Sequence, residues 1–252
     1  MLLFPTPQIN LGLNVISKRA DGFHDIETLF VPVTQYMDIL EVVFAEKPAM
    51  VQYGMDYQTN PQDNLCYKAY LLMADKYKIS PIAIHLYKNI PVGAGLGGGS
   101  ADAAFTLAAI NILFNLNLNN ETLAKLAAQL GSDCPFFIYN KPMLARGKGE
   151  ILSPYDDIDL SNYEIRIATP DVSVSTKEAY SGITPHKPKI PLEEVLKTPV
   201  DNWKENLVND FETTVFAKYP EIARLKEDFY RQGALYASMS GSGSSVYGIF
   251  RK

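Results

Sequence analysis

A glycine-rich segment, PVGAGLGGGSADAA at positions 91–104, has the residue types needed to bind an anion. Its five glycines remove side chains and permit positive φ, so that backbone N–H groups can converge on one point. The helical pattern that starts at Ser100 adds exposed N–H groups and a dipole that favour negative charge. The segment therefore predicts phosphate binding at the start of a helix. The five glycines are Gly93, Gly95, Gly97, Gly98 and Gly99.

Other glycine-rich patterns fit this segment less well. The string G-x-G-x-x-G is present, but a dinucleotide-binding domain also needs a regular βαβ unit with an acidic residue about 20 positions further on. A Walker loop needs Gly-Lys-Ser/Thr, and no lysine stands there. The HRD and DFG elements of protein kinases do not occur. A glycine turn without a ligand remains the alternative, and five glycines in seven residues are a costly way to build one.

Strands and helices around the loop are expected to position it. Alternating apolar residues predict a strand at 82–87, and the run DILEVVF predicts another at 38–44. Ser100 is expected to cap a helix that extends to about Phe114. A second helix is predicted from about Asn120 to Gly131, and the apolar run at 136–139 suggests a buried strand.

The second part of the chain mixes strands and helices without a regular βαβα order. We expect a strand at 163–168, a proline-rich loop at 184–191, and helices at about 203–217 and 220–232. A strand pair at 234–238 and 245–250 closes the chain. This mixture predicts an α+β fold. The polar stretch at 153–162 places a domain boundary there, which gives domains at 1–155 and 156–252.

Composition narrows the class of protein. The chain has 252 residues, 47% of them apolar, and a formal net charge of -5, which argues against nucleic-acid binding. Its two cysteines form no CxxC pair and no cluster with histidine, so we expect a reducing, cytoplasmic environment. No apolar run reaches the roughly 20 residues of a membrane helix. We expect neither a nucleic-acid partner nor a membrane partner.

The glycine-rich segment resembles the second motif of the GHMP kinase superfamily. QINLGLNVISKRADGFHDIETLF (8–30), GSDCPFF (131–137), ARGKGEILSP (145–154) and SMSGSGSSVYGIF (238–250) resemble, in order, the kinases of the non-mevalonate isoprenoid pathway that act on a cytidylylated methylerythritol. The resemblance implies a two-domain GHMP kinase fold, with a ribosomal-protein-S5-like N-terminal domain and a ferredoxin-like C-terminal domain. It also implies transfer of the ATP γ-phosphoryl group to the substrate 2-hydroxyl, with Mg2+ and with no metal ligands specified.

Asp133 stands where the family keeps its catalytic aspartate, and Asn10 matches the family's asparagine. A carboxylate beside the acceptor hydroxyl can accept or orient its proton. An aspartate that ends a helix is the alternative. Gln8 departs from the family, which usually has a lysine expected to pair with that aspartate. Either another cation, Lys148 or Lys177, compensates for the uncharged amide of Gln8, or the enzyme is slow.

The resemblance also implies a pyrimidine site. Phe23 and His24 match the aromatic-histidine pair that receives the cytosine, and Tyr180 matches the aromatic residue on the opposite face, with Thr176 nearby. From spacing alone, core packing would explain the two aromatic residues, and a hydrogen-bonded structural role would explain His24. The glycine turn that contains Gly241 and Ser242 is expected to approach the phosphates, or simply to form a tight hairpin.

The remaining predicted ligands concern the nucleotide. Asn64 and Lys88 align with positions of the family on the adenine or ribose side, although Lys88 could equally be an exposed charge at a strand end. Asp102 either stabilises its helix through the dipole or orders Mg2+ through water. The loop itself supplies the other expected ATP contacts, which are Pro91, Gly93, Gly95, Leu96, Gly97, Gly98, Gly99, Ser100 and Ala101.

Two alternative functions remain at this stage. One is another GHMP kinase, for mevalonate, homoserine or a sugar, which would give Phe23, His24 and Tyr180 no pyrimidine to surround. The other is a catalytically reduced nucleotide-binding homologue, favoured by Gln8 alone. The expected partner is a small-molecule substrate, a cytidine diphosphate sugar alcohol. The expected state is a monomer or a weak homodimer.

Overall fold

A computed structural model describes residues 1–55 and 60–252, which form two compact units. Unit 1 comprises Met1–Pro7, Pro32–Val92 and Gly97–Lys141, and unit 2 comprises Gln8–Val31, Gly93–Leu96 and Pro142–Lys252. Each unit is therefore assembled from separate stretches of the chain. The predicted domains at 1–155 and 156–252 are continuous stretches of the chain, whereas the compact units are not. The domain division stays a prediction.

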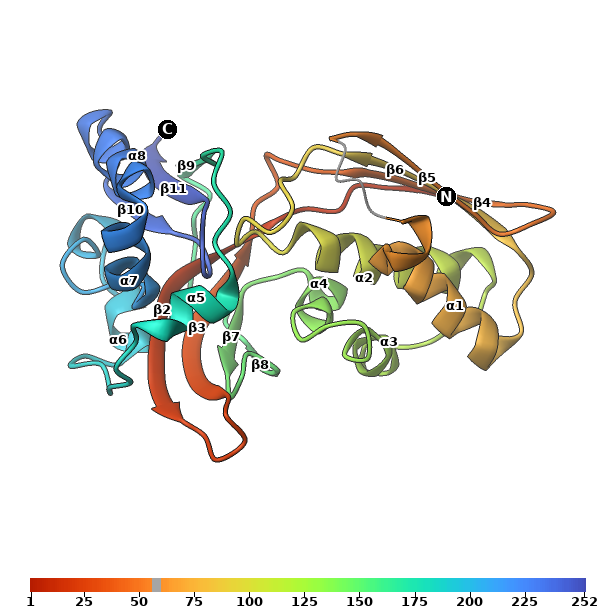
Figure 1. The fold of residues 1–252 in the computed structure, drawn as a ribbon, viewed down its shortest axis with the longest axis horizontal. Coiled ribbons are helices and arrows are strands. Elements are labelled where there is room, and N and C mark those ends of the chain that lie inside the picture. The colour runs from red at the N-terminus through yellow and green to blue at the C-terminus, as the bar shows by residue number, and fades with distance from the viewer. Residues whose placement is uncertain (56–59) are drawn as a thin grey trace. The chain divides into compact units, whose positions relative to one another are not determined.

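Unit 1 contains a four-stranded sheet in the order β1-β4-β6-β5 (Figure 1). Its strands are β1 (Leu2–Leu3), β4 (Ile39–Phe44), β5 (Ala49–Gly54) and β6 (Ile82–Lys88). β6 pairs antiparallel with β4 and parallel with β5. Both predicted strands of this sheet are confirmed, and Ile82, Ile84 and Leu86 of β6 are buried, as their alternation indicates.

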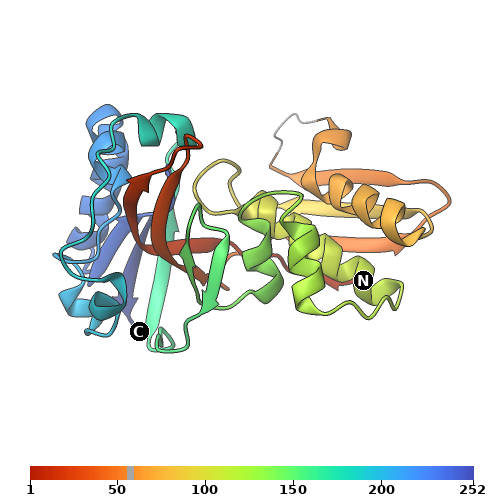
Figure 2. The same ribbon diagram turned by 90° about the horizontal axis from the view of Figure 1, so that it is seen from below.

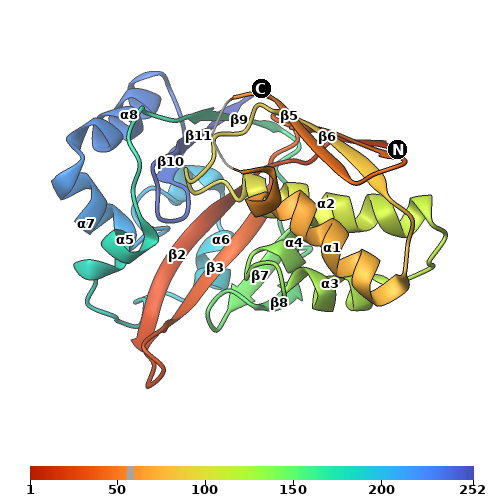
Figure 3. The same ribbon diagram turned by 45° about the vertical axis from the view of Figure 1, so that its right-hand side comes forward.

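Helices cover one face of this sheet, with α1 and α2 side by side (Figures 1 and 3). The helices are η1 (Pro61–Asp63), α1 (Leu65–Tyr77), α2 (Gly98–Leu113), α3 (Asn120–Ala127) and α4 (Cys134–Tyr139). Leu107 and Ile110 of α2 join the buried strand residues in one hydrophobic core. The burial of apolar residues on both elements fixes α2 against the sheet. It thereby sets the direction in which α2 leaves the glycine loop.

Two expectations for unit 1 are corrected. Residues 136–139 lie in helix α4 and not in a strand, because a short apolar run has no periodicity that separates the two, while Pro135 favours the first turn of a helix. The N-cap of α2 is Gly97 and not Ser100. Gly97 has φ 67° and no side chain, so no side-chain cap occupies the first N–H groups of α2.

Unit 2 contains two sheets. The first has the order β2-β3-β7-β8, and the long strands β2 and β3 lie side by side (Figure 3). The second has the order β10-β11-β9, with both pairings antiparallel, and it confirms the predicted strand at 163–168 and the closing strand pair. The strands are β2 (Gln8–Lys18), β3 (His24–Pro32), β7 (Met143–Arg146), β8 (Ile151–Pro154), β9 (Tyr163–Ala168), β10 (Tyr236–Met239) and β11 (Val246–Arg251).

Helices α7 and α8 pack beside the second sheet (Figure 2). Phe229 of α8 and Phe250 of β11 meet edge to face, with ring centroids 6.0 Å apart. The first predicted helical segment begins later than expected, since residues 203–210 precede α7. The helices of this unit are α5 (Thr176–Ser181), α6 (Leu192–Leu196), η2 (Val200–Asn202), α7 (Phe211–Lys218) and α8 (Pro220–Arg231).

Neither of the two cysteines forms a disulfide. Cys66 and Cys134 are both buried, and burial raises the pKa of both thiols, that of Cys134 to about 11. Neither thiol is therefore ionised near neutral pH. Within residues 1–55 and 60–252, no helix has both the length and the apolar character needed to cross a membrane.

Candidate active site

The glycine loop joins the end of β6 to the start of α2. In unit 1, Gly98 lies where a side chain would not fit: a Cβ would come 2.8 Å from Cγ2 of Ile90 and 3.3 Å from Nζ of Lys88. Gly99 has room, since the nearest atom to its Cβ would be Cδ1 of Leu65 at 3.9 Å. Gly98 thus permits close packing under the loop. The start of α2 is left with uncapped N–H groups, as anion binding requires.

Residues Gly93–Leu96 of the loop belong to unit 2, where backbone hydrogen bonds hold them. Gln8 N–H donates to the Leu96 carbonyl at 3.0 Å, and Ser245 N–H donates to the Ala94 carbonyl at 3.0 Å. The Ser240 hydroxyl donates to the Gly95 carbonyl at 2.8 Å. A Cβ on Gly95 would lie 2.1 Å from the Ser240 carbonyl oxygen, so only glycine fits here.

The predicted glycine turn at 241–245 lies against this part of the loop. Gly241 has φ 54°, and a Cβ there would lie 3.2 Å from the Gly95 carbonyl oxygen. Asn209, a residue that sequence reasoning missed, donates from Nδ2 to the carbonyls of Met239 and Gly241, at 2.8 and 2.9 Å. The hydroxyls of Thr176 and Ser242 lie 3.4 Å apart. The structure thus brings two predicted substrate residues together and adds Asn209 as the support of their turn.

Lys88 is not the exposed charge that one interpretation of the sequence expected. It is 2% exposed, and its ammonium donates to carboxylates of Asp38 and Asp102. Asp102 is likewise 2% exposed, with one carboxylate oxygen 2.7 Å from Nζ of Lys88 and the other without a hydrogen-bond partner. Burial is the largest influence on the Asp102 carboxyl and raises its pKa to about 8. Nothing in the sequence pattern pointed to Asp38.

Asn64 caps helix α1. Its Oδ1 accepts from the Cys66 N–H at 2.9 Å, and its Nδ2 donates to Oε1 of Gln52 at 3.4 Å. The capping bond satisfies one of the helix's first N–H groups. This contact gives Asn64 a local structural role, and its contact with a nucleotide stays a prediction.

Asp133 immediately precedes α4, at the N-cap position and not at the end of a helix. Its carboxylate makes no capping bond to the backbone and accepts a hydrogen bond from the Ser132 hydroxyl at 3.1 Å. Burial raises the pKa of this carboxyl, and the Ser132 hydroxyl opposes the rise. A carboxylate with a raised pKa and without a capping bond can act as a proton acceptor.

Gln8 and Asn10 lie at the start of β2 and are buried, with 3% of each exposed. The amide oxygen of Gln8 is buried without a hydrogen-bond partner. The side-chain amide of Asn10 donates from Nδ2 to the Thr28 hydroxyl at 3.0 Å, and the backbone carbonyl of Asn10 accepts from the Tyr247 hydroxyl at 2.6 Å. The Asn10 amide is therefore fixed in direction, whereas one polar atom of Gln8 remains unsatisfied.

The predicted pyrimidine residues lie close together in unit 2. His24 stacks on Tyr180 with ring centroids 4.6 Å apart and planes 17° apart, and Tyr180 meets Phe211 edge to face at 4.7 Å. Phe23 is 57% exposed, and Nζ of Lys148 lies 4.6 Å from its ring centroid. Core packing does not explain Phe23. Lys148 thus makes a cation–π contact with the Phe23 ring.

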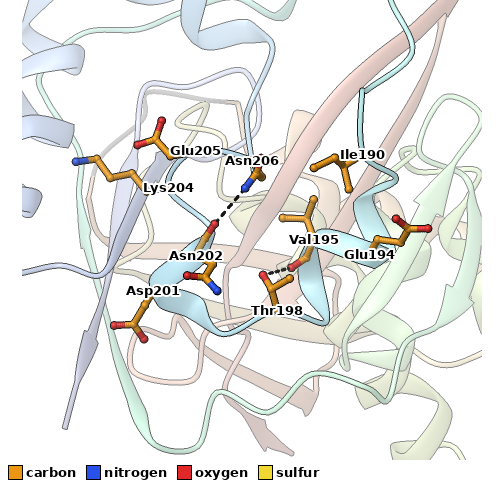
Figure 4. Close-up of a pocket in the computed structure, with 9 residues that line it drawn as sticks. All are labelled: Ile190, Glu194, Val195, Thr198, Asp201, Asn202, Lys204, Glu205 and Asn206. Atoms are coloured by element: carbon orange, nitrogen blue, oxygen red, sulfur yellow. Dashed lines mark hydrogen bonds between the residues drawn. The ribbon is translucent and has the colours of Figure 1, made fainter.

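A pocket of about 470 Å³ occurs elsewhere in unit 2, near α6 and η2 (Figure 4). Three carboxylates, one lysine and apolar side chains such as Val195 line it; the charged residues are Glu194, Asp201, Glu205 and Lys204. None of the predicted site residues lines this pocket. With three carboxylates against one ammonium, the lining is acidic overall and does not suit an anionic nucleotide.

Comparison with known proteins identifies the class. Residues 64–141 match the profile of the GHMP kinases N terminal domain, and residues 192–252 match that of the GHMP kinases C terminal domain. A homoserine kinase structure from Cytophaga hutchinsonii has a TM-score of 0.70 at 20% identity, over 98% of this chain and 85% of that one, and therefore shows the fold alone. The α+β GHMP kinase fold is confirmed, and the chain is a small-molecule kinase.

Closer relatives define the family within that class. The 4-diphosphocytidyl-2-C-methyl-D-erythritol kinase of Bacteroides thetaiotaomicron is 52% identical over 99% of this chain and 92% of its own. A crystal structure of 4-(cytidine 5'-diphospho)-2C-methyl-D-erythritol kinase has a TM-score of 0.84 at 32% identity, over 99% of this chain and 90% of that one. The chain belongs to the 4-diphosphocytidyl-2-C-methyl-D-erythritol kinase family.

Proposed function

We propose that this kinase transfers the γ-phosphoryl group of ATP to the 2-hydroxyl of 4-diphosphocytidyl-2-C-methyl-D-erythritol. The observation that carries the choice of substrate is the exposed ring of Phe23, which precedes His24 in the chain. His24 and Tyr180 stack directly on each other, with ring centroids 4.6 Å apart, so a base would stack on an outer ring face and not between these two rings. Flat rings of this kind bind a nucleobase by stacking. The names of the close relatives support the same substrate.

The proposed roles follow the chemistry of each side chain. Asp133 accepts or orients the proton of the acceptor hydroxyl, and the raised pKa of its carboxyl favours proton acceptance. The uncapped start of α2 and the glycine loop hold the ATP phosphates. Asn10, fixed by Thr28, is proposed to hydrogen-bond the reacting groups. Phosphoryl transfer depends mainly on such positioning and charge neutralisation.

Mg2+ is part of the proposal because ATP phosphates need charge neutralisation. The described residues contain no group of three or more His, Cys, Asp or Glu side chains arranged to hold a metal. This fits Mg2+, which is usually held by phosphates, water and one or two carboxylates. The cytoplasmic location and the monomeric or weakly dimeric state remain predictions.

A coupled assay of ADP release tests the proposal. The wild-type protein is given Mg2+, ATP and one acceptor at a time: the cytidylylated methylerythritol, mevalonate, homoserine or galactose. We expect turnover with the first acceptor alone, and 31P NMR should show a new phosphate monoester. Turnover with another acceptor would favour a different GHMP activity. ATP binding without turnover on any acceptor would favour a catalytically reduced homologue.

A further inference from the structure

Three buried charged residues of unit 1 meet beneath the glycine loop. Lys88 ends β6, Asp38 precedes β4, and Asp102 lies in the first turns of α2. Lys88 and Asp102 are each 2% exposed, and Asp38 is 0% exposed. The Lys88 ammonium donates to both carboxylates, at 2.7 Å in the case of Asp102. We call these three residues the loop clamp.

Each member of the loop clamp holds a different part of the chain. The second oxygen of Asp38 accepts the backbone N–H groups of Asn89 and Ile90, at 2.6 and 2.9 Å, and these are the first two residues after β6. Asp102 stands on α2, just past the other end of the loop. Lys88 therefore connects the point where the chain leaves the sheet to the point where it enters the helix.

We propose that the loop clamp fixes both ends of the phosphate-binding loop, so that Lys88 is a positioning residue and not a ligand of the nucleotide. Its ammonium is 2% exposed and already engaged by two carboxylates, which leaves little surface for a ligand. A loop with fixed ends loses less conformational freedom when phosphate binds. This inference rests on the proposed ATP site.

Substitution of Asp102 distinguishes a positioning role of Lys88 from a role as nucleotide ligand. A positioning role predicts that the affinity for ATP falls, whereas a ligand role predicts that it stays the same or rises. Asp102→Ala removes the attachment to α2 but leaves the balanced Lys88–Asp38 pair, so the variant is expected to fold. We expect its affinity for Mg·ATP, measured by calorimetry on the full chain, to fall about tenfold. Asp102→Asn keeps an acceptor for Lys88 and should bind within about threefold of wild type.

Affinity unchanged or tighter in Asp102→Ala would overturn the inference, since release of one carboxylate would then have freed Lys88 for the nucleotide. Equal loss in Asp102→Ala and Asp102→Asn would also overturn it, because the hydrogen bond to Lys88 would not be the cause. Lys125→Met, which breaks an exposed pair with Glu121, is the matched control and should bind ATP as wild type does.

Binding is measured below the unfolding range of every variant, so that a loss of affinity is not a loss of fold. For Asp102→Ala, KM for ATP should rise together with the calorimetric loss of affinity. If wild type binds ATP but does not phosphorylate the cytidylylated acceptor, the proposed function fails while the affinity series still tests the loop clamp.

Discussion

At the scale of single residues, the proposed chemistry depends most on Asp133 and Gln8. Sequence resemblance identified both positions, because short motifs carry identity well. The resemblance could not predict the contacts of these side chains, because they depend on packing. In the structure the Asp133 carboxylate makes no capping hydrogen bond, and the amide oxygen of Gln8 has no hydrogen-bond partner. No sequence pattern pointed to Asp38, because its partner in the buried ion pair is Lys88, 50 residues away along the chain.

Asp133→Asn should lower kcat by roughly 10²- to 10⁴-fold, the usual contribution of a positioned acid or base. ATP affinity should stay within about threefold of wild type if the residue acts on the acceptor alone. Because burial raises the pKa of Asp133, wild-type kcat/KM should rise with pH through a value above the ordinary aspartate range. Steady-state kinetics between pH 5 and 9 measure both effects.

Ser132→Ala provides the matched comparison for this pH profile. Its hydroxyl donates to the Asp133 carboxylate and lowers the pKa of that group, so its removal should move the acid limb of kcat/KM to higher pH. An acid limb that is unchanged in Ser132→Ala and retained in Asp133→Asn would assign the titration to a different residue.

Gln8→Lys tests the cation that the family has and this chain lacks. A lysine at this position brings a full charge to transferring phosphate, and we expect kcat to rise about tenfold or more. Gln8→Met controls for size, since it fills the same space without charge or hydrogen bonds. A rise of less than about threefold would mean that another cation already serves. Loss of activity in Lys148→Met, assayed alongside, would point to the lysine beside Phe23.

At the scale of elements, the local sequence pattern predicted most strands. It failed where a short apolar run is compatible with both a strand and a helix. The alternation of β6 identified a strand with one buried face, and the structure has that face. Residues 136–139 carried four apolar side chains with no period, and helix α4 formed instead of a strand. Gly97 capped α2 in place of Ser100, because the loop enters the helix with positive φ.

Gly95→Ala and Gly93→Ala form a matched pair of loop variants. Both glycines have positive φ, which costs an alanine about 1–2 kcal/mol. A Cβ on Gly93 meets nothing within 4 Å, whereas a Cβ on Gly95 would lie 2.1 Å from the Ser240 carbonyl oxygen. Gly95→Ala should therefore lower both the melting temperature and the affinity for ATP more than Gly93→Ala does. Thermal unfolding with and without ATP measures both, and equal losses would contradict the close contact at Gly95.

At the scale of the whole molecule, each compact unit combines segments that are distant in the sequence. Unit 2 takes its strands β2 and β3 from the beginning of the chain and its last sheet from the end. Composition shifts, such as the polar stretch at 153–162, give no sign of this interleaving, because it depends on strand pairing between remote residues. The family resemblance predicted the two-domain GHMP kinase fold, but residue pattern alone predicted only the α+β class.

The stability of the whole protein should depend on the buried Asp102. Its pKa is about 8 in the folded state and about 3.9 in an unfolded chain, so the folded protein binds more protons between these values. The free energy of unfolding therefore gains a contribution that is fully present below about pH 4 and is lost as pH rises towards about 8. The charged and titratable groups around it are Lys88, Asp38 and Cys66.

Asp102→Asn removes this titration without removing the hydrogen-bond acceptor. The melting temperature of wild type relative to Asp102→Asn should therefore fall by about 3 °C or more between pH 5 and pH 8. Asp159→Asn is the control. The Ser161 N–H lowers the pKa of that exposed carboxyl, so its titration changes stability only at acid pH and should leave the range from pH 5 to pH 8 unaffected. Calorimetric scans at half-unit intervals of pH measure the difference. A constant difference from pH 5 to pH 8 would show that Asp102 is ionised throughout and that Lys88 outweighs the cost of its burial.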